Sequence, residues 1–460
     1  MRRLRPYRLY STTVSLCAEC LASVPAKVVI ADGQVFLHKR CALHGFQEEL
    51  LEEDADWYVR RLDYEKPGTQ IQPDTAMTQA GCPRDCGLCP DHEQHTCIAL
   101  LEVTGACDLR CPTCFADAGS GSPLPLATID AMLDACLRAE GGQADVLQVS
   151  GGEPTTHPDI VTILQHALGR PFRWVMLNTN GVRIADDEAF ADALASMKGR
   201  LEIYLQFDGV DDRVHRALRG RPLHAIKERA LARLAEREIP VTLVSTVAAG
   251  INDDSVGALV TYGIRSPGVR GINLQPVSHV GRGGGAPGLS RLTLSGVLRR
   301  IEKQTAGMLL RDDFVPLPCD TDRVALTFLY RQNGQFVPVT RDADIKRHLP
   351  LLENTLMFDA ADVLRNTASG LLAGQGFCNC LAFLKDFLPL APIGLGFKPQ
   401  ADQARFVTAN TFRISVTSFL DRFNFELRAM KKECVHVLTQ DGRRIPFSAF
   451  NILHRGREAG

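Results

Sequence analysis

Between residues 98 and 275 the chain alternates short apolar stretches with stretches whose apolar positions recur at helical spacing. Short apolar strands that alternate with amphipathic helices are the pattern of parallel β/α units. The pattern therefore predicts an α/β fold with six parallel strands, built as a partial (β/α)6 barrel. The predicted strands are Ile98–Thr104, Asp145–Ser150, Arg173–Asn178, Leu201–Phe207, Val241–Val247 and Gly271–Gln275.

Polar and small residues gather where these strands end. A cysteine-rich loop follows the first strand, VSGGEPTTHP ends the second, LNTNG ends the third, and the fourth runs into LQFDG. The active sites of barrels built from parallel strands lie at the carboxyl ends of the strands. We therefore expect one functional site that collects these four loops.

Composition narrows the class of protein. At 460 residues the chain is long enough for roughly three units of typical domain size. A net charge of -1 gives no reason to expect nucleic acid as a partner. The basic start MRRLRPYRLYSTT lacks the apolar run of a signal peptide, and no apolar stretch reaches the roughly 18 residues of a membrane span. Fifteen cysteines then indicate metal binding in a reducing cytoplasm rather than disulfides.

Cys107, Cys111 and Cys114 form a C-x3-C-x2-C run in TGACDLRCPTCFADAG. Three thiolates leave one iron of a four-iron cluster without a protein ligand, whereas clusters that only carry electrons usually have four. The alternative is a zinc site whose fourth ligand lies elsewhere in the chain. The spacing resembles the radical SAM superfamily signature, which implies a [4Fe-4S] cluster whose open iron chelates S-adenosylmethionine.

The GGEP sequence after the second strand strengthens this resemblance. Paired glycines at a strand end let the backbone approach a ligand closely, and the superfamily's GGEP motif meets the amino group of S-adenosylmethionine. Further contacts to the ribose or carboxylate are expected from the ends of later strands, although capping and turn formation is an equally simple role for these residues. The expected cofactor-binding residues are Gly151, Gly152, Glu153, Pro154, Asn178, Thr179, Asn180, Gln206, Asp208 and Gln275.

Three further sets of candidate metal ligands lie outside the barrel. Cys17, Cys20, Cys41 and His44 resemble a zinc-ribbon or rubredoxin-like knuckle, which binds zinc or iron; the alternative is a surface histidine beside a buried apolar cysteine. Cys82, Cys86, Cys89 and Cys97 suit a complete cluster or a structural zinc. Because four cysteines already complete that ligand set, His92 and His95 are expected to lie around the metal ligands or at the surface, and not to bind the metal.

The last set is scattered through the final third of the chain. Cys319, Cys378, Cys380 and Cys434 would form a further cluster, and isolated buried thiols are the alternative. Cys136 lies at helical period in IDAMLDACLRAE and is expected to be a packing residue.

The metal motifs, taken with the C-terminal FNFELRAMKKECVHVLTQDGRRIPFSAFN, resemble the tetraether lipid synthase branch of the superfamily. That resemblance implies carbon-carbon coupling of lipid alkyl chains, a rubredoxin-like site, and auxiliary clusters that include the four C-terminal cysteines. Ser448 departs from it, because a cysteine is expected there. The apolar stretches LMFDAADVLRNTASGLLAGQGF and LAFLKDFLPLAPIGLGF offer material for a lipid groove, though such runs more often form a core. The basic N-terminus would allow peripheral contact with anionic lipid.

The sequence thus predicts four units: a metal knuckle (1–70), a cluster loop (71–100), the barrel (101–285) and a C-terminal α/β cap that holds the auxiliary cluster and the substrate (286–460). The predicted function is hydrogen abstraction from an unactivated C-H bond, with lipid alkyl chains as substrate and a low-potential donor such as ferredoxin or flavodoxin. Radical modification of a pterin or a peptide is the alternative enzyme, and a non-enzymatic iron-sulfur electron carrier is the alternative of another class.

Overall fold

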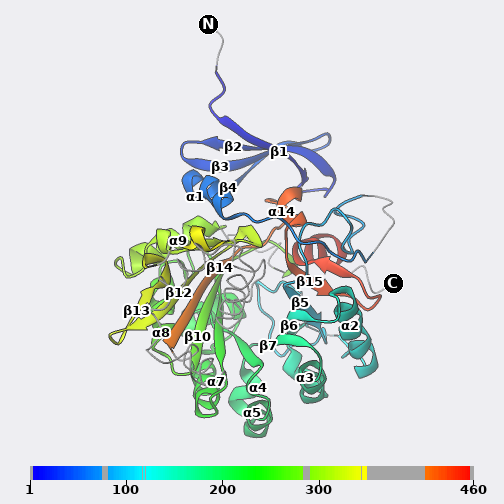
Figure 1. Cartoon of the computed structure of the whole chain (residues 1–460), viewed down its shortest axis with the longest axis vertical. Coiled ribbons are helices and arrows are strands. Elements are labelled where there is room, and N and C mark those ends of the chain that lie inside the picture. Colours follow the sequence, from blue (N-terminus) through cyan, green and yellow to red (C-terminus); the bar gives the residue numbers. More distant parts are fainter. Residues whose placement is uncertain are drawn as a thin grey trace, which may run out of the picture.

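The computed structural model describes residues 4–74, 81–116, 118–119, 121–282, 291–342, 344–349 and 410–455. The N-terminal knuckle is an antiparallel sheet in the order β1-β2-β3-β4, drawn in blue in Figure 1. A short helix α1 (Ala55–Arg60) follows it. The four strands span Arg8–Leu16, Ser23–Ala31, Gln34–Cys41 and Gly45–Glu52.

All six predicted barrel strands are present. They pair in parallel in the order β5 to β10, and the predicted ends differ from the observed ends by two residues or fewer. The strands are β5 (Ile98–Glu102), β6 (Ala144–Ser150), β7 (Phe172–Thr179), β8 (Leu201–Gln206), β9 (Val241–Val247) and β10 (Val269–Pro276). Their apolar side chains and those of the intervening helices form one continuous core.

Helices cover the outside of this sheet, as Figure 1 shows for α2, α3, α5 and α7. Cys136 lies on α2, is 1% exposed and belongs to the core, which confirms its predicted packing role. The helices are α2 (Leu126–Ala139), α3 (Ile160–Leu168), α4 (Val182–Asp186), α5 (Glu188–Ala195), α6 (Asp212–Arg219), α7 (His224–Glu236), α8 (Val256–Arg265) and α9 (Leu294–Gln304).

The C-terminal segment extends the barrel sheet at both edges, in addition to supplying the expected α/β elements. β14 (Thr411–Thr417) pairs in parallel with β10, and β15 (Val435–Leu438) pairs in parallel with β5. β12 (Asp320–Gln332) runs antiparallel to β14. The remaining elements are β11 (Val315–Leu317), β13 (Gln335–Pro338), α10 (Ile345–His348), α14 (Leu427–Lys431), β16 (Arg444–Pro446) and α15 (Phe447–Ala449).

The knuckle is anchored to the C-terminal segment by a buried lysine. Lys39 is 2% exposed, and its Nζ donates to the carbonyl oxygens of Leu16, Arg422 and Phe423 at 2.7, 3.0 and 2.8 Å. Three acceptors satisfy the ammonium group that burial would otherwise penalise. The knuckle is therefore fixed to residues just beyond β14.

Candidate active site and metal centres

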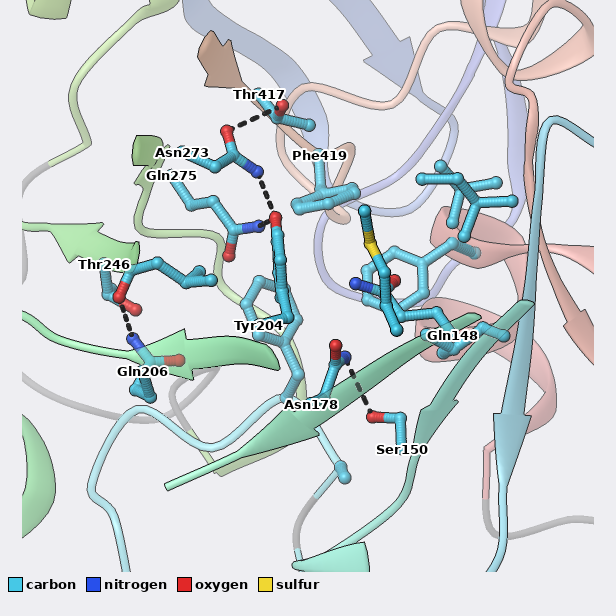
Figure 2. A pocket seen from close by; sticks show the side chains of 18 of the residues that line it. Gln148, Ser150, Asn178, Tyr204, Gln206, Thr246, Asn273, Gln275, Thr417 and Phe419 are labelled. Atoms are coloured by element: carbon cyan, nitrogen blue, oxygen red, sulfur yellow. Dashed lines mark hydrogen bonds between the residues drawn. The ribbon is translucent and has the colours of Figure 1, made fainter. Parts of the chain in front are cut away.

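A pocket at the carboxyl ends of the strands collects the residues that the sequence singled out. It is lined by all three cysteines of the C-x3-C-x2-C loop, by the GGEP residues, and by inward side chains of β5 to β10, β12 and β14. Figure 2 shows polar side chains on neighbouring strands that point into this pocket. We call it the chamber.

The GGEP loop lies directly on the cysteine loop. The backbone N-H of Gly152 donates to the Thr104 carbonyl at 2.7 Å, and that of Glu153 donates to the Ala106 carbonyl at 2.8 Å. A Cβ atom on Gly152 would lie 2.1 Å from the Ala106 oxygen, and one on Gly151, at φ +131°, would lie 2.4 Å from the Thr104 oxygen. Both glycines are thus required for contact between the two loops, whatever ligand they also approach.

Glu153 ties the GGEP loop to the end of β7. Its buried carboxylate accepts hydrogen bonds from Thr155 N and Oγ1 at 3.1 and 2.7 Å, from Thr179 Oγ1 at 2.7 Å and from Asn180 N at 2.7 Å. Burial raises the pKa of this carboxyl against those hydrogen bonds. Asn180 in turn donates to Asp108 of the cysteine loop at 2.6 Å. Three predicted site residues therefore form the scaffold that holds the loops together.

Asp208 was expected in the cofactor pocket, but it does not line the chamber. It forms an ion pair with Arg219, which does line the chamber. Its carboxylate receives Arg219 Nε at 2.6 Å and Nη2 at 2.7 Å, together with Gln206 Nε2 at 2.8 Å and Thr246 N at 2.9 Å. With its oxygens engaged and its exposure 0%, Asp208 has little capacity left for a cofactor. Burial alone would raise the pKa of the Asp208 carboxyl, but the charge and hydrogen bonds of Arg219 lower this pKa below its usual value.

Sequence reasoning missed the cations that line the chamber: Arg413 and Arg455 from the C-terminal segment, and Arg219 and Lys227 from the helices after β8. Arg219 forms an ion pair with Asp208 and lines the chamber together with Cys111. Lys227 is fully buried, burial lowers its pKa to about 8, and its Nζ donates to the Asn180 carbonyl. Arg219 and Lys227 are each a single residue on a helix, so no local motif marked them. They place positive charge beside the three thiols.

Carboxamides and hydroxyls project into the chamber from neighbouring strands, as Figure 2 shows. Asn178 donates to Ser150 Oγ at 3.3 Å, and its Oδ1 has no hydrogen-bond partner within the described part of the chain. Tyr204 receives Asn273 Nδ2 and, at 3.4 Å, Gln275 Nε2. A buried amide oxygen without a partner is costly unless a ligand supplies a donor. Asn178 therefore fits a cofactor with N-H or O-H groups.

The three thiols of the cysteine loop pack together with Leu109 and Leu223. Burial raises the pKa of Cys107 to about 12 and also raises that of Cys111. A buried thiolate needs a compensating cation, and iron bound by the thiols would provide it. With the cationic wall and the free acceptor on Asn178, these residues fit the cluster and the sulfonium cofactor.

The knuckle residues converge as predicted. The ligand atoms of Cys17, Cys20, Cys41 and His44 all lie within 4.8 Å of one another. His44 Nδ1 lies 3.4 Å from Cys17 Sγ and 3.6 Å from Cys41 Sγ. Burial alone would raise the pKa of the Cys17 thiol, but hydrogen bonds from the backbone of Cys20 and Glu19 lower this pKa to about 6. The set has the ligand number and types of a tetrahedral metal site.

Cys97 does not join Cys82, Cys86 and Cys89, so that predicted four-cysteine set is wrong. The sulfur atoms of Cys97, Cys319 and Cys434 all lie within 4.8 Å of one another, and the Cys319 and Cys434 sulfurs are 3.9 Å apart. The backbone explains the difference: Cys97 N donates to the Cys434 carbonyl at 3.0 Å because β5 and β15 pair from that point. Cys434 also lines the chamber.

Of the predicted C-terminal set, the structure brings Cys319 and Cys434 together, while Cys378 and Cys380 lie outside the described residues. Ser448 is buried, donates to Glu433 Oε1 at 2.9 Å and accepts from Leu420 N at 3.1 Å. Burial raises the pKa of Glu433 to about 7.

His92 is also buried, with its pKa lowered by burial to about 4, and it lines a small cavity with Cys82, Cys86 and Cys89.

Comparison with known proteins agrees with this site. The model of the Radical SAM superfamily matches residues 101–262, and that of the HMPTM N-terminal zinc ribbon domain matches residues 9–53. The curated 7,8-dihydro-6-hydroxymethylpterin dimethyltransferase of Methanocaldococcus jannaschii is 30% identical over 488 residues, which cover 96% of this chain and 94% of that enzyme. The chain therefore belongs to the radical SAM superfamily, in the family of this M. jannaschii enzyme.

Other similarities are confined to part of the chain. The mycofactocin maturase MftC of Mycobacterium ulcerans is 31% identical over 160 residues, 35% of this chain and 39% of that protein. The crystal structure of Streptococcus suis SuiB bound to S-adenosylmethionine has a TM-score of 0.39 at 19% identity and covers 46% of this chain and 47% of SuiB. This structural likeness is too weak to support a functional conclusion.

Membership of the superfamily implies a [4Fe-4S] cluster and S-adenosylmethionine, and the zinc ribbon implies a zinc or iron site. Enzymes of this superfamily act on small molecules or peptides and need a reductant. Within the described residues, no helix is both long enough and apolar enough to cross a membrane.

Proposed function

We propose that the protein cleaves S-adenosylmethionine reductively and removes a hydrogen atom from an unactivated C-H bond of a small polar heterocycle of the pterin class. The observation that carries this proposal is the chamber, which is bounded by the three thiols and the GGEP loop and into which carboxamides and hydroxyls project among apolar side chains. When bound, the cluster and S-adenosylmethionine supply the 5'-deoxyadenosyl radical. The chain's own residues bind, orient and desolvate the reactants.

The proposed cofactor contacts come from the GGEP end of the chamber. The backbone of Gly151 and Gly152 would meet the amino group, and Asn178 Oδ1 offers an acceptor with no partner among the described residues. Arg219 and Lys227 would compensate the charge of the thiolates and the carboxylate. Glu153, Thr179, Asn180 and Asp208 act indirectly, since they hold these groups in place.

The rest of the wall combines apolar side chains with carboxamides, so it fits a flat heterocycle with polar edges better than a bare alkyl chain. Gln148, Gln206 and Gln275 line the same chamber as Tyr204, whereas Asn273 is already hydrogen-bonded to Tyr204, Ser415 and Thr417. Buried carboxamides packed against hydrocarbon would lose hydrogen bonds to water without replacement, at a cost of about 1–3 kcal/mol for each unpaired group. A pterin offers ring nitrogens, an oxo group and an amino group that match them. The name of the M. jannaschii relative, which aligns over nearly its whole length, supports the same substrate class.

Lipid alkyl chain coupling remains the competing hypothesis. None of the relatives named above has a lipid in its name, and the apolar segments expected to form a groove, 356–377 and 381–397, lie outside the described residues. The tetraether lipid synthase branch, the peripheral membrane contact and the ferredoxin or flavodoxin donor stay predictions. Peptide modification is a third substrate class, in line with the maturase that matches the barrel.

The test uses anaerobically reconstituted protein, S-adenosylmethionine and dithionite. We expect 5'-deoxyadenosine, and deuterium transfer into it from 7,8-dihydro-6-hydroxymethylpterin that is deuterated on carbon. Cys111→Ala should abolish the product, whereas Cys136→Ala, which removes a thiol buried in the core, should keep it. Absence of 5'-deoxyadenosine would favour an electron carrier. Deuterium transfer from labelled lipid but not from the pterin would refute the proposed substrate.

A further inference from the structure

The loop that carries Cys82, Cys86 and Cys89 has three thiols where the sequence predicted four. Cys97 is bound into the other group, with its sulfur within 4.8 Å of those of Cys319 and Cys434. The remaining three cysteines have the spacing C-x3-C-x2-C, the same as Cys107, Cys111 and Cys114. A cluster in this loop that only carries electrons would need one more protein ligand.

His92 lies where such a ligand is needed. It lines the same small cavity as the three thiols, and its backbone N-H donates to the Cys89 carbonyl at 2.9 Å, so a tight turn brings the ring back toward the loop. The side chain is 6% exposed. Imidazole nitrogen is an established ligand of iron in clusters that combine cysteine and histidine.

The hydrogen bond of the His92 ring to a carbonyl oxygen leaves its Nδ1 atom available to bind a metal. His92 Nε2 lies 2.9 Å from the Glu433 carbonyl oxygen and 3.1 Å from His436 Nε2, and His436 Nε2 lies 2.8 Å from the same oxygen. A carbonyl oxygen only accepts, so the tautomer of His92 that donates to it carries the proton on Nε2 and the lone pair on Nδ1. Metal-binding histidines typically donate their other ring N-H to a carbonyl or carboxylate in this way.

Two other nearby oxygen ligands are already engaged. The Ser448 hydroxyl, at the position where a cysteine was expected, donates to Glu433 and accepts from Leu420 N. The Glu433 carboxylate accepts the Ser448 N-H at 3.2 Å in addition to that hydroxyl. Neither residue lines the cavity that the three thiols share with His92.

We propose that His92 is the fourth protein ligand, through Nδ1, of an iron-sulfur cluster held by Cys82, Cys86 and Cys89. The proposal does not depend on the substrate. A histidine in place of a fourth thiolate removes one negative charge from the ligand set, which raises the reduction potential of the cluster. This site therefore accepts an electron more readily than an all-cysteine cluster in the same loop would.

The test uses the full chain with Cys107, Cys111 and Cys114 replaced by alanine, so that the radical cluster is absent. The protein is labelled with 15N-histidine, reconstituted with iron and sulfide, reduced with dithionite and studied by electron-nuclear double resonance. We expect the large 15N coupling of a directly bound imidazole. His92→Ala should abolish it, whereas His95→Gln, at a neighbouring histidine whose ring contacts Cys97, should keep it.

His92→Cys provides a second measurement in a variant that keeps four ligands. We expect unchanged iron content and a reduction equilibrium at least tenfold less favourable, which corresponds to about 59 mV for one electron. The proposal is overturned if the parent shows no 15N coupling, if the coupling survives His92→Ala, or if Cys82→Ala leaves the iron content unchanged. An unaltered potential in His92→Cys would also overturn it.

Discussion

Replacing Gly152 by alanine should separate the GGEP loop from the cysteine loop. The added Cβ would lie 2.1 Å from the Ala106 oxygen and 2.7 Å from its carbonyl carbon. Neither is the end of a flexible side chain, so one backbone must move. A displacement of about 1 Å relieves the contact, and it breaks the hydrogen bonds that Gly152 and Glu153 make to Thr104 and Ala106. At about 1 kcal/mol each, their loss destabilises the loop pair by about 2 kcal/mol.

The functional effect should exceed the effect on stability. A misplacement of about 1 Å near the reacting groups can cost on the order of 100-fold in rate. We expect 5'-deoxyadenosine formation to fall by about that factor, measured anaerobically with dithionite at saturating S-adenosylmethionine. Gly119→Ala is the matched control, because its Cβ would meet nothing within 4 Å. Equal rates for Gly152→Ala and the unmodified protein would refute the steric argument.

Three further predictions concern the site and its surroundings. Asn178→Leu should weaken S-adenosylmethionine binding about tenfold or more in calorimetry. The stability of the variant should change little, because the hydrogen bond lost to Ser150 is offset by removal of a buried acceptor that lacks a partner. Unchanged affinity would exclude Asn178 from the cofactor site. Because the folded-state pKa of Lys227 is about 8 against 10.5 for the free side chain, the unfolded chain binds more protons between these pH values. The free energy of unfolding in urea should therefore rise by about 3 kcal/mol from pH 8 to 10.5, relative to that of Lys227→Met. Parallel pH profiles of the two proteins would contradict this. His44→Ala or a chelator should release the knuckle metal and expose β1–β4 to proteases; full metal retention would argue against His44 as a ligand.

The barrel strands were predictable because short runs rich in apolar and β-branched residues alternate with amphipathic helices. β9 was placed at its observed bounds, Val241–Val247, and its seven residues are all buried. The positions of β14 and β15 were not predictable, because β14 pairs with β10 across more than a hundred residues of intervening chain. Local patterns carry no information on such pairing.

The same distinction separates the metal sites. The knuckle ligands converge as predicted because two hairpin turns present them, and the C-x3-C-x2-C loop is local in sequence. Cys97 was assigned to the wrong group because it is near Cys89 in sequence, whereas the pairing of β5 with β15 carries it to Cys434. Asp208 was placed in the cofactor pocket from its position after β8, but its partner Arg219 comes from the end of α6. Contacts between different elements, of the backbone for Cys97 and of the side chains for Asp208, decided the two outcomes.

The placement of β14 and β15 has a consequence for biosynthesis. Both outer strands of the parallel array, β5 and β10, acquire their neighbours only from residues 411–438. A ribosome that has produced the six central strands therefore holds a nascent chain with two open sheet edges, each able to pair with another polypeptide. Aggregation during translation should depend on how quickly the last fifty residues emerge, so truncation before residue 411 should yield insoluble protein.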